Sequence, residues 1–257
     1  MTATTAPLPA TETSQARFWE LDLFRGIAII MMVIFHLLWD LWAFQILPDI
    51  ILYAGFWKYF QRATATAFLI LVGISLTVSY RRAKQQGDDA TSLWHKFFWR
   101  GLRIFGMGMC FTLFGWVTGF GQVHIGILHL IGLSIILTYP LLEYRWLNLT
   151  LWGIFFVVGS FINTIYLDHN WLVWFGLHTR FYVALDYFPL IPWLGVVLLG
   201  IFLGNTLYQT EKRRFTFPDF RQFPPIRLLR FLGRHSLLIY VIHQPLLLAG
   251  LYLLGYI

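Results

Sequence analysis

Charged residues and cysteine are both scarce in this chain of 257 residues. Only 12% of the residues are charged, against about 25% in an average soluble domain, whereas 58% are hydrophobic and 19% aromatic. No core of this size buries so much apolar surface, which excludes a water-soluble globule. The single cysteine, Cys110, excludes an intrachain disulfide and a cysteine-rich metal site. The H-E-x-x-H motif is also missing, and we predict no metal.

The sequence contains several long runs of apolar residues. About 20 consecutive apolar residues span the hydrocarbon layer of a bilayer, and seven segments of about that length can be counted. The sequence therefore predicts an all-α, polytopic membrane helix bundle with about seven transmembrane helices. Residues 1–16 lack the basic region of a signal peptide and are expected to form a disordered tail, followed by a single domain over residues 17–257. The seven segments cover residues 26–44, 56–79, 99–120, 123–142, 146–166, 188–208 and 230–254.

The basic residues are distributed unevenly among the connections. Loops rich in Lys and Arg stay on the cytoplasmic side of a membrane. With the N-terminus in the cytoplasm, sixteen of the 19 Lys and Arg residues fall inside, and Lys58, Arg62 and Arg180 fall outside. We therefore read the net charge of +7 as a mark of membrane topology, and not of nucleic-acid binding. The inside residues are Arg17, Arg25, Arg81, Arg82, Lys84, Lys96, Arg100, Arg103, Arg145, Lys212, Arg213, Arg214, Arg221, Arg227, Arg230 and Arg234.

The first predicted helix carries polar residues along one face. Arg25 and His36 are eleven positions apart, which places them only about 20° apart around a helix and about 16 Å apart along it. An ionisable side chain at lipid depth is a functional candidate by default. Asp40 follows His36 at i+4, so its carboxylate is expected to orient the imidazole of a general base. The alternative is that His36 hydrogen-bonds a neighbouring helix while Asp40 lies in interfacial water.

Two further histidines are expected at the same depth in the membrane as His36. His129 lies near the outer end of the fourth segment, and His243 lies in the middle of the last. With His36 they can surround one cavity, and we take all three as candidate catalytic residues together with Asp40. Hydrogen bonding between helices is the alternative role. Gly73–Ser75 lacks the final glycine of a nucleophile elbow and indicates helix packing through small residues.

Basic residues also recur with helical spacing at the inner ends of two segments. Such clusters suit a polyphosphate, because guanidinium groups pair with phosphate oxygens. Binding to anionic lipid headgroups is the alternative for each residue. The candidate phosphate-binding residues are Arg25, Lys96, Arg100, Arg103, Arg230 and Arg234, with Arg227 on the same stripe as the last two.

The outer connection over residues 167–187 mixes ionisable and aromatic side chains. Such a mixture can stack on and hydrogen-bond a polar ring such as a sugar. Anchoring at the membrane interface explains the aromatic residues equally well.

Several stretches of the chain resemble a known family. Over nearly all of the sequence after the tail, the chain resembles the bacterial membrane family grouped with the catalytic domain of heparan-α-glucosaminide N-acetyltransferase. In the wider superfamily, the first helix of surface-glycan O-acetyltransferases similarly has an Arg-Gly pair followed by an essential His, at the spacing of Arg25 and His36. The stretches are RFWELDLFRGIAIIMMVIFH (Arg17–His36), GILHLIGLSIIL (Gly126–Leu137), DYFPLIPWLGVVLLGIFLG (Asp186–Gly204) and FLGRHSLLIYVIHQP (Phe231–Pro245).

The resemblance implies acetyl transfer across the membrane, from cytoplasmic acetyl-CoA to an acceptor reached from the other side. We therefore expect an acyl-CoA-dependent acetyltransferase in the cytoplasmic membrane of a bacterium, with a carbohydrate or another hydroxyl or amine as acceptor. Arg25 and the basic stripes would hold the CoA phosphates, and His36 would act as general base or as a transiently acetylated nucleophile. The alternatives are a redox protein with histidine-ligated haem and a proton-coupled transporter. Homo-oligomerisation is left open.

Overall fold

The structure is a computed structural model that describes residues 18–118, 125–182, 184, 186–208, 213–216 and 218–257. The predicted tail, Arg17 and Lys212 lie outside the described residues. Within them the chain is all-α, as predicted, with eight α-helices and two short 3₁₀ turns. The helices are α1 (Trp19–Ala43), α2 (Gly55–Gln85), α3 (Ala90–Thr118), α4 (Ile127–Leu137), α5 (Arg145–Ile162), α6 (Leu190–Leu207), α7 (Pro224–Arg234) and α8 (Ser236–Leu253), and the turns are η1 (Tyr139–Leu141) and η2 (Val173–Phe175).

Six of these helices are long and apolar enough to cross a membrane: α1, α2, α3, α5, α6 and α8. The segment expected over residues 123–142 is shorter, because α4 ends at Leu137 and only the η1 turn follows it. Pro140 lies in that turn, and proline disfavours the continuation of an α-helix because it lacks the backbone N–H. The chain is a multi-pass membrane protein with a polytopic helical bundle.

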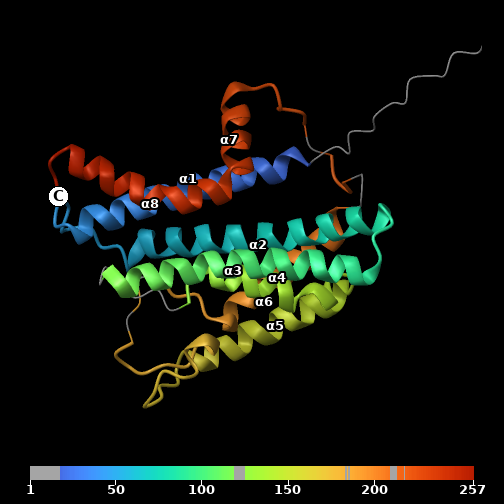
Figure 1. Ribbon diagram of the computed structural model, residues 1–257, viewed down its shortest axis with the longest axis horizontal. Coiled ribbons are helices and arrows are strands. Elements are labelled where there is room, and N and C mark those ends of the chain that lie inside the picture. Colours follow the sequence, from blue (N-terminus) through green and yellow to red (C-terminus); the bar gives the residue numbers. More distant parts are fainter. Residues whose placement is uncertain (1–17, 119–124, 183, 185, 209–212, 217) are drawn as a thin grey trace, which may run out of the picture.

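The long helices lie nearly parallel and alternate in direction, as Figure 1 shows. In that view α1 and α8 lie together above α2, whereas α5 and α6 lie below it. The most extensive contacts join α2 with α6, α5 with α6, α3 with α4, and α1 with α7. The alternation places the start of α1, the end of α2 and the start of α3 at one end of the bundle. Sequence reasoning assigned this end to the cytoplasm.

The structure corrects the single segment expected over residues 230–254. The helix is broken at His235, whose backbone leaves the helical region with φ −101° and ψ 16°. The preceding helix, α7, stands across the spanning helices in Figure 1. Its three arginines, Arg227, Arg230 and Arg234, explain why α7 does not continue α8 through the hydrocarbon, where each charge is costly.

Small residues allow the closest helix approaches. A Cβ atom on Gly73 of α2 would lie 2.2 Å from the carbonyl oxygen of Val197, and one on Gly200 of α6 would lie 2.4 Å from that of Ile70. The packing role predicted for Gly73–Ser75 is therefore confirmed at Gly73. In membranes, where water does not drive helices together, such close backbone contact is a main source of helix association.

Candidate functional site

A cavity of about 550 Å³ lies between the α1–α8 pair and helices α2, α3 and α4. It extends from Arg25 and Arg100 at the inner end, which is the end that the sequence assigns to the cytoplasm, to Trp39 and Tyr53 at the opposite, outer end. There the indole Nε1 of Trp39 donates a hydrogen bond of 2.9 Å to the Tyr53 hydroxyl. Most of its lining is apolar. The polar groups that line it are therefore the candidates to bind or to react with a ligand.

His36 of α1 and His243 of α8 face each other in the middle of this cavity. Their ring centroids are 4.8 Å apart and the planes are inclined by 71°. His243 is 8% exposed and its Nδ1 atom lies 2.7 Å from the carbonyl oxygen of Tyr240. His129 lines the same cavity. The structure thus brings together the three histidines that the sequence separates by about 200 positions.

Asp40 is completely buried beside this pair. Its Oδ1 atom accepts a hydrogen bond of 2.6 Å from Nε2 of Gln244, the residue after His243. The sequence predicted a contact between Asp40 and His36 on the same helix, and the observed hydrogen bond instead crosses to α8. Gln244 was missed at that stage, although an amide inside an apolar helix was a signal for such a partner.

His129 sits at the start of α4 and is fully buried. Its Nδ1 accepts a hydrogen bond of 3.1 Å from the backbone N–H of Gly126, and its Nε2 lies 3.3 Å from the Thr112 hydroxyl. Asp186 lines the cavity beside it and accepts a hydrogen bond of 3.0 Å from the Ile127 N–H. Both side chains satisfy N–H groups that the first turn of a helix leaves free. Burial raises the pKa of Asp186 to about 6.

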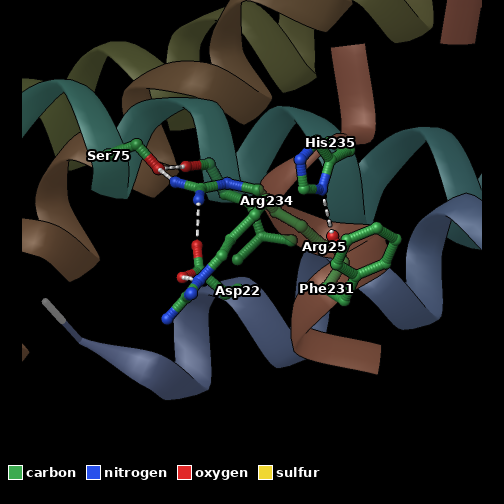
Figure 2. A network of polar contacts seen from close by, with 7 residues as sticks. Asp22, Arg25, Ser75, Phe231, Arg234 and His235 are labelled. Carbon is green, nitrogen blue, oxygen red and sulfur yellow. Dashed lines mark hydrogen bonds and ion pairs between the residues drawn. The ribbon is translucent and has the colours of Figure 1, made fainter. Parts of the chain in front are cut away.

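A network of charged groups lies at the inner end of the cavity, and Figure 2 shows its side chains. Buried Asp22 pairs with Arg25 at 2.8 Å and with Arg234 of α7 at 3.4 Å. Arg25 also donates a hydrogen bond to the hydroxyl of Ser75 on α2. The network therefore joins α1, α2 and α7 at one point.

A second cavity, of about 390 Å³, lies on the other side of this network. We call it the vestibule. Arg25, Ser75 and Arg100 line both cavities, so the two meet at these residues. The remaining polar residues of the vestibule lie at the end of α2 and the start of α3. They are Ser79, Arg82, Gln86 and Lys96, with Asp22 from α1.

The sequence around this site matches a known protein family. The sequence profile described as "Heparan-alpha-glucosaminide N-acetyltransferase, catalytic" matches residues 17–245. The chain belongs to this family. The resemblance seen in the sequence is therefore confirmed, and membership in the N-acetyltransferase family implies a transmembrane acetyltransferase. No curated protein and no solved structure matches the chain significantly.

The basic residues proposed for an acetyltransferase donor site do not all reach the cavities. Lys96 and Arg100 line the vestibule, and Arg234 lines the central cavity. Arg103 is exposed and donates to the Trp99 carbonyl at 3.2 Å, and Arg230 donates to the Arg221 carbonyl at 3.3 Å; neither lines these two cavities. Arg82, which the sequence placed only among the inside residues, does line the vestibule.

The aromatic side chains of the outer connection pack on one another. His178 and Tyr182 have ring centroids 5.2 Å apart, and Tyr182 and Tyr187 are 5.1 Å apart. Tyr187 also donates a hydrogen bond of 2.9 Å to the Val173 carbonyl. This cluster stabilises the connection that carries Asp186 to the cavity. Among the residues that the structure describes, no group of three His, Cys, Asp or Glu side chains is placed to hold a metal ion.

Proposed function

We propose that the protein transfers an acetyl group from acyl-CoA, bound from the cytoplasmic side, to a hydroxyl or amine acceptor that enters from the opposite side. One observation carries the proposal: a basic vestibule meets an apolar cavity at Arg25, Ser75 and Arg100, and two facing histidines, His36 and His243, lie farther along that cavity. An acyl donor with an anionic head and a long neutral arm fits this arrangement, with the head in the basic vestibule and the arm along the apolar cavity toward the histidines.

The vestibule supplies the positive charge that the CoA phosphates require. Arg25, Arg82, Lys96 and Arg100 line it. Lys96 has one long ion pair, at 3.4 Å from Asp88, so exchange of that carboxylate for a phosphate is inexpensive. Arginine is suited to this task because its guanidinium pairs with two phosphate oxygens at once.

The distance from the vestibule to the histidines suits the pantetheine arm. Arg25 and His36 are eleven positions apart on α1, which corresponds to a rise of about 16 Å. An extended pantetheine arm can cover this distance along the apolar wall and bring the thioester to the histidine pair. Exclusion of water by that wall protects the thioester from hydrolysis.

The chemical step needs a base for the acceptor's proton. His36 and His243 are the groups in position, and general-base catalysis typically contributes about 10² to 10⁴ in rate. Transient acetylation of an imidazole nitrogen is the alternative route through the same residues. Asp40 and Gln244 would hold α1 and α8 at the spacing that the pair requires, and His129 would shape the outer wall.

Labelled acetyl-CoA tests the proposal. The purified full-length protein in nanodiscs is incubated with [14C]acetyl-CoA and glucosamine, and transfer of label and release of free CoA are measured together. Arg100→Ala should raise the KM for acetyl-CoA at least about tenfold, because a hydrogen bond to a charged group contributes about 1.5–3 kcal/mol.

Arg103→Ala is the matched control, since Arg103 lies one turn farther along α3 and lines neither cavity. Its KM should stay within about twofold of the wild-type value. Equal increases in the KM for acetyl-CoA in Arg100→Ala and Arg103→Ala would contradict binding of the CoA phosphates in the vestibule. Absence of any acetyl transfer by the wild-type protein would overturn the proposed function.

A further inference from the structure

The hydrogen bond of His243 determines which of its nitrogens can react. Its Nδ1 lies 2.7 Å from the carbonyl oxygen of Tyr240. A carbonyl oxygen can only accept a hydrogen bond, so Nδ1 must carry the hydrogen. In the neutral ring the lone pair is then on Nε2.

The Nε2 atom of His243 is left unused by the protein. Within the described residues it is buried and has no hydrogen-bond partner, although its ring lines the central cavity and faces His36. Buried polar groups in native proteins are nearly always paired, and an exception calls for an explanation. No protein group occupies this lone pair, and the ring that carries it lines the cavity.

His129 has the opposite arrangement. The backbone N–H of Gly126 can only donate, so the Nδ1 lone pair of His129 is occupied. Its Nε2–H is then the donor to Thr112, whose hydroxyl can in turn donate to the Gly108 carbonyl at 3.5 Å. Both nitrogens of His129 are engaged, and the ring offers no free base.

His36 differs from both. No hydrogen bond of His36 in the described part of the chain determines which ring nitrogen carries its hydrogen, and the side chain is half-buried. Of the three histidines, only His243 thus combines a defined tautomer with a free lone pair at the cavity.

We propose that His243, through Nε2, is the general base of the acetyl transfer; the inference rests on the proposed function. The acceptor O–H or N–H gives its proton to Nε2 as its oxygen or nitrogen forms a bond to the carbonyl carbon of the thioester. The C–S bond breaks, and the sulfur takes the proton from the imidazolium to give free CoA. The Tyr240 carbonyl stabilises the imidazolium through the Nδ1–H bond, in the position that a carboxylate has in a catalytic triad.

The adjacent hydrogen bond helps to place this base. Gln244 follows His243 directly and donates to buried Asp40 on α1 at 2.6 Å. This bond ties the turn of α8 that carries His243 to the helix that carries His36. Asp40 and Gln244 are therefore positioning residues for the base.

Matched glutamine substitutions test the assignment in the labelled acetyl-CoA and glucosamine assay. His243→Gln should lower kcat about 10² to 10⁴-fold, with the KM for acetyl-CoA changed less than about threefold, and should remove the acid limb of the pH–rate profile. His36→Gln should lower kcat by less than about tenfold. His235→Gln, at an exposed site on the α7–α8 junction, is the control and should leave kcat unchanged.

A kcat loss in His36→Gln equal to or larger than that in His243→Gln would overturn the assignment, as would full activity of His243→Gln. Either result leaves acetyl transfer itself intact, which separates this failure from that of the proposed function. Should the glutamine variants not fold, chemical labelling of the wild-type protein decides. Diethyl pyrocarbonate reacts with a free imidazole lone pair, so it should modify His243, with protection by acetyl-CoA, and should spare His129. Modification of His129 with His243 unmodified would refute the tautomer assignment.

Discussion

Gly233 of α7 packs directly on Asp22 of α1: a Cβ atom at position 233 would lie 1.7 Å from the carbonyl oxygen of Asp22. The same contact brings Arg234 within 3.4 Å of the Asp22 carboxylate. On the neighbouring turn, a Cβ on Gly26 would lie 2.0 Å from the Leu229 carbonyl oxygen. Two glycines, one on each helix, thus allow α7 to cross α1 beside the charged network, where the vestibule meets the central cavity.

Gly233→Ala should separate these helices, because the obstructing atoms are backbone and cannot rotate away. We expect a loss of about 2 kcal/mol or more in stability and a higher KM for acetyl-CoA, since Arg234 and Arg25 share Asp22. Thermal unfolding in nanodiscs and the KM measure the two effects. Gly250→Ala on α8 is the control, because nothing lies within 4 Å of its added Cβ; equal melting temperatures for both variants would disprove the close contact.

The hydrogen bond between Asp40 and Gln244 should be visible as an energetic coupling. Asp40→Ala and Gln244→Leu each leave a buried polar group without its partner, which costs about 1–3 kcal/mol. In the double variant the two losses should not add, and the coupling energy from the cycle should be about 1 kcal/mol or more. Pairing Asp40→Ala with Gln45→Leu, an exposed position, should give additive losses. Additivity in the Asp40–Gln244 cycle would argue against the bond.

Protein stability should depend on pH through Asp186. Burial raises its folded-state pKa to about 6, above the value of about 3.9 expected in an unfolded chain. Between these values the folded protein binds more protons than the unfolded one, so the contribution of Asp186 to stability is complete below about pH 4 and is lost as the pH rises through about 6. The loss amounts to at most roughly 3 kcal/mol.

Asp186→Asn removes the titrating group and should flatten this pH dependence. Melting temperatures between pH 4 and 7.5 compare the variant with the wild type. Asp168→Asn, in the same connection, is the control and should preserve the wild-type slope. A variant Asp186→Asn with an unaltered slope would show that another group is responsible.

His129 should matter for stability more than for the chemical step. His129→Ala leaves the Gly126 N–H at a buried helix start without this acceptor and removes one hydrogen bond of the Thr112 hydroxyl, at a cost of about 1–3 kcal/mol. His129→Gln retains part of this hydrogen bonding and should recover part of the lost melting temperature and most of kcat. If His129→Gln folded like the wild type but lost kcat as strongly as His243→Gln, a direct catalytic role for His129 would be supported instead.

Composition and the length of the apolar runs were sufficient to predict the membrane bundle, whereas the family was indicated by the resemblance of four stretches of the sequence. Twenty apolar residues in a row have few structural options, because the bilayer requires every backbone group to be hydrogen-bonded within the segment. The polar face of α1 was also predictable, since helical periodicity places Arg25 and His36 on one line whatever the neighbours are. The break at His235 could not be predicted from the sequence. Arginines beside an apolar run are compatible with the end of a spanning helix, where their side chains reach the membrane surface, and equally with a separate helix that lies across the bundle.

The tertiary structure decided which polar groups meet. Asp40 bonds to Gln244 and not to its neighbour on the same helix, and Arg103 falls outside the vestibule although it follows Arg100 at helical spacing. The state of each histidine likewise depends on a carbonyl or an N–H presented at its ring: His243 meets the Tyr240 carbonyl, and His129 meets the Gly126 N–H. Hydropathy and periodicity describe one segment at a time, whereas cavities and most partners of buried polar atoms arise between segments far apart in the chain.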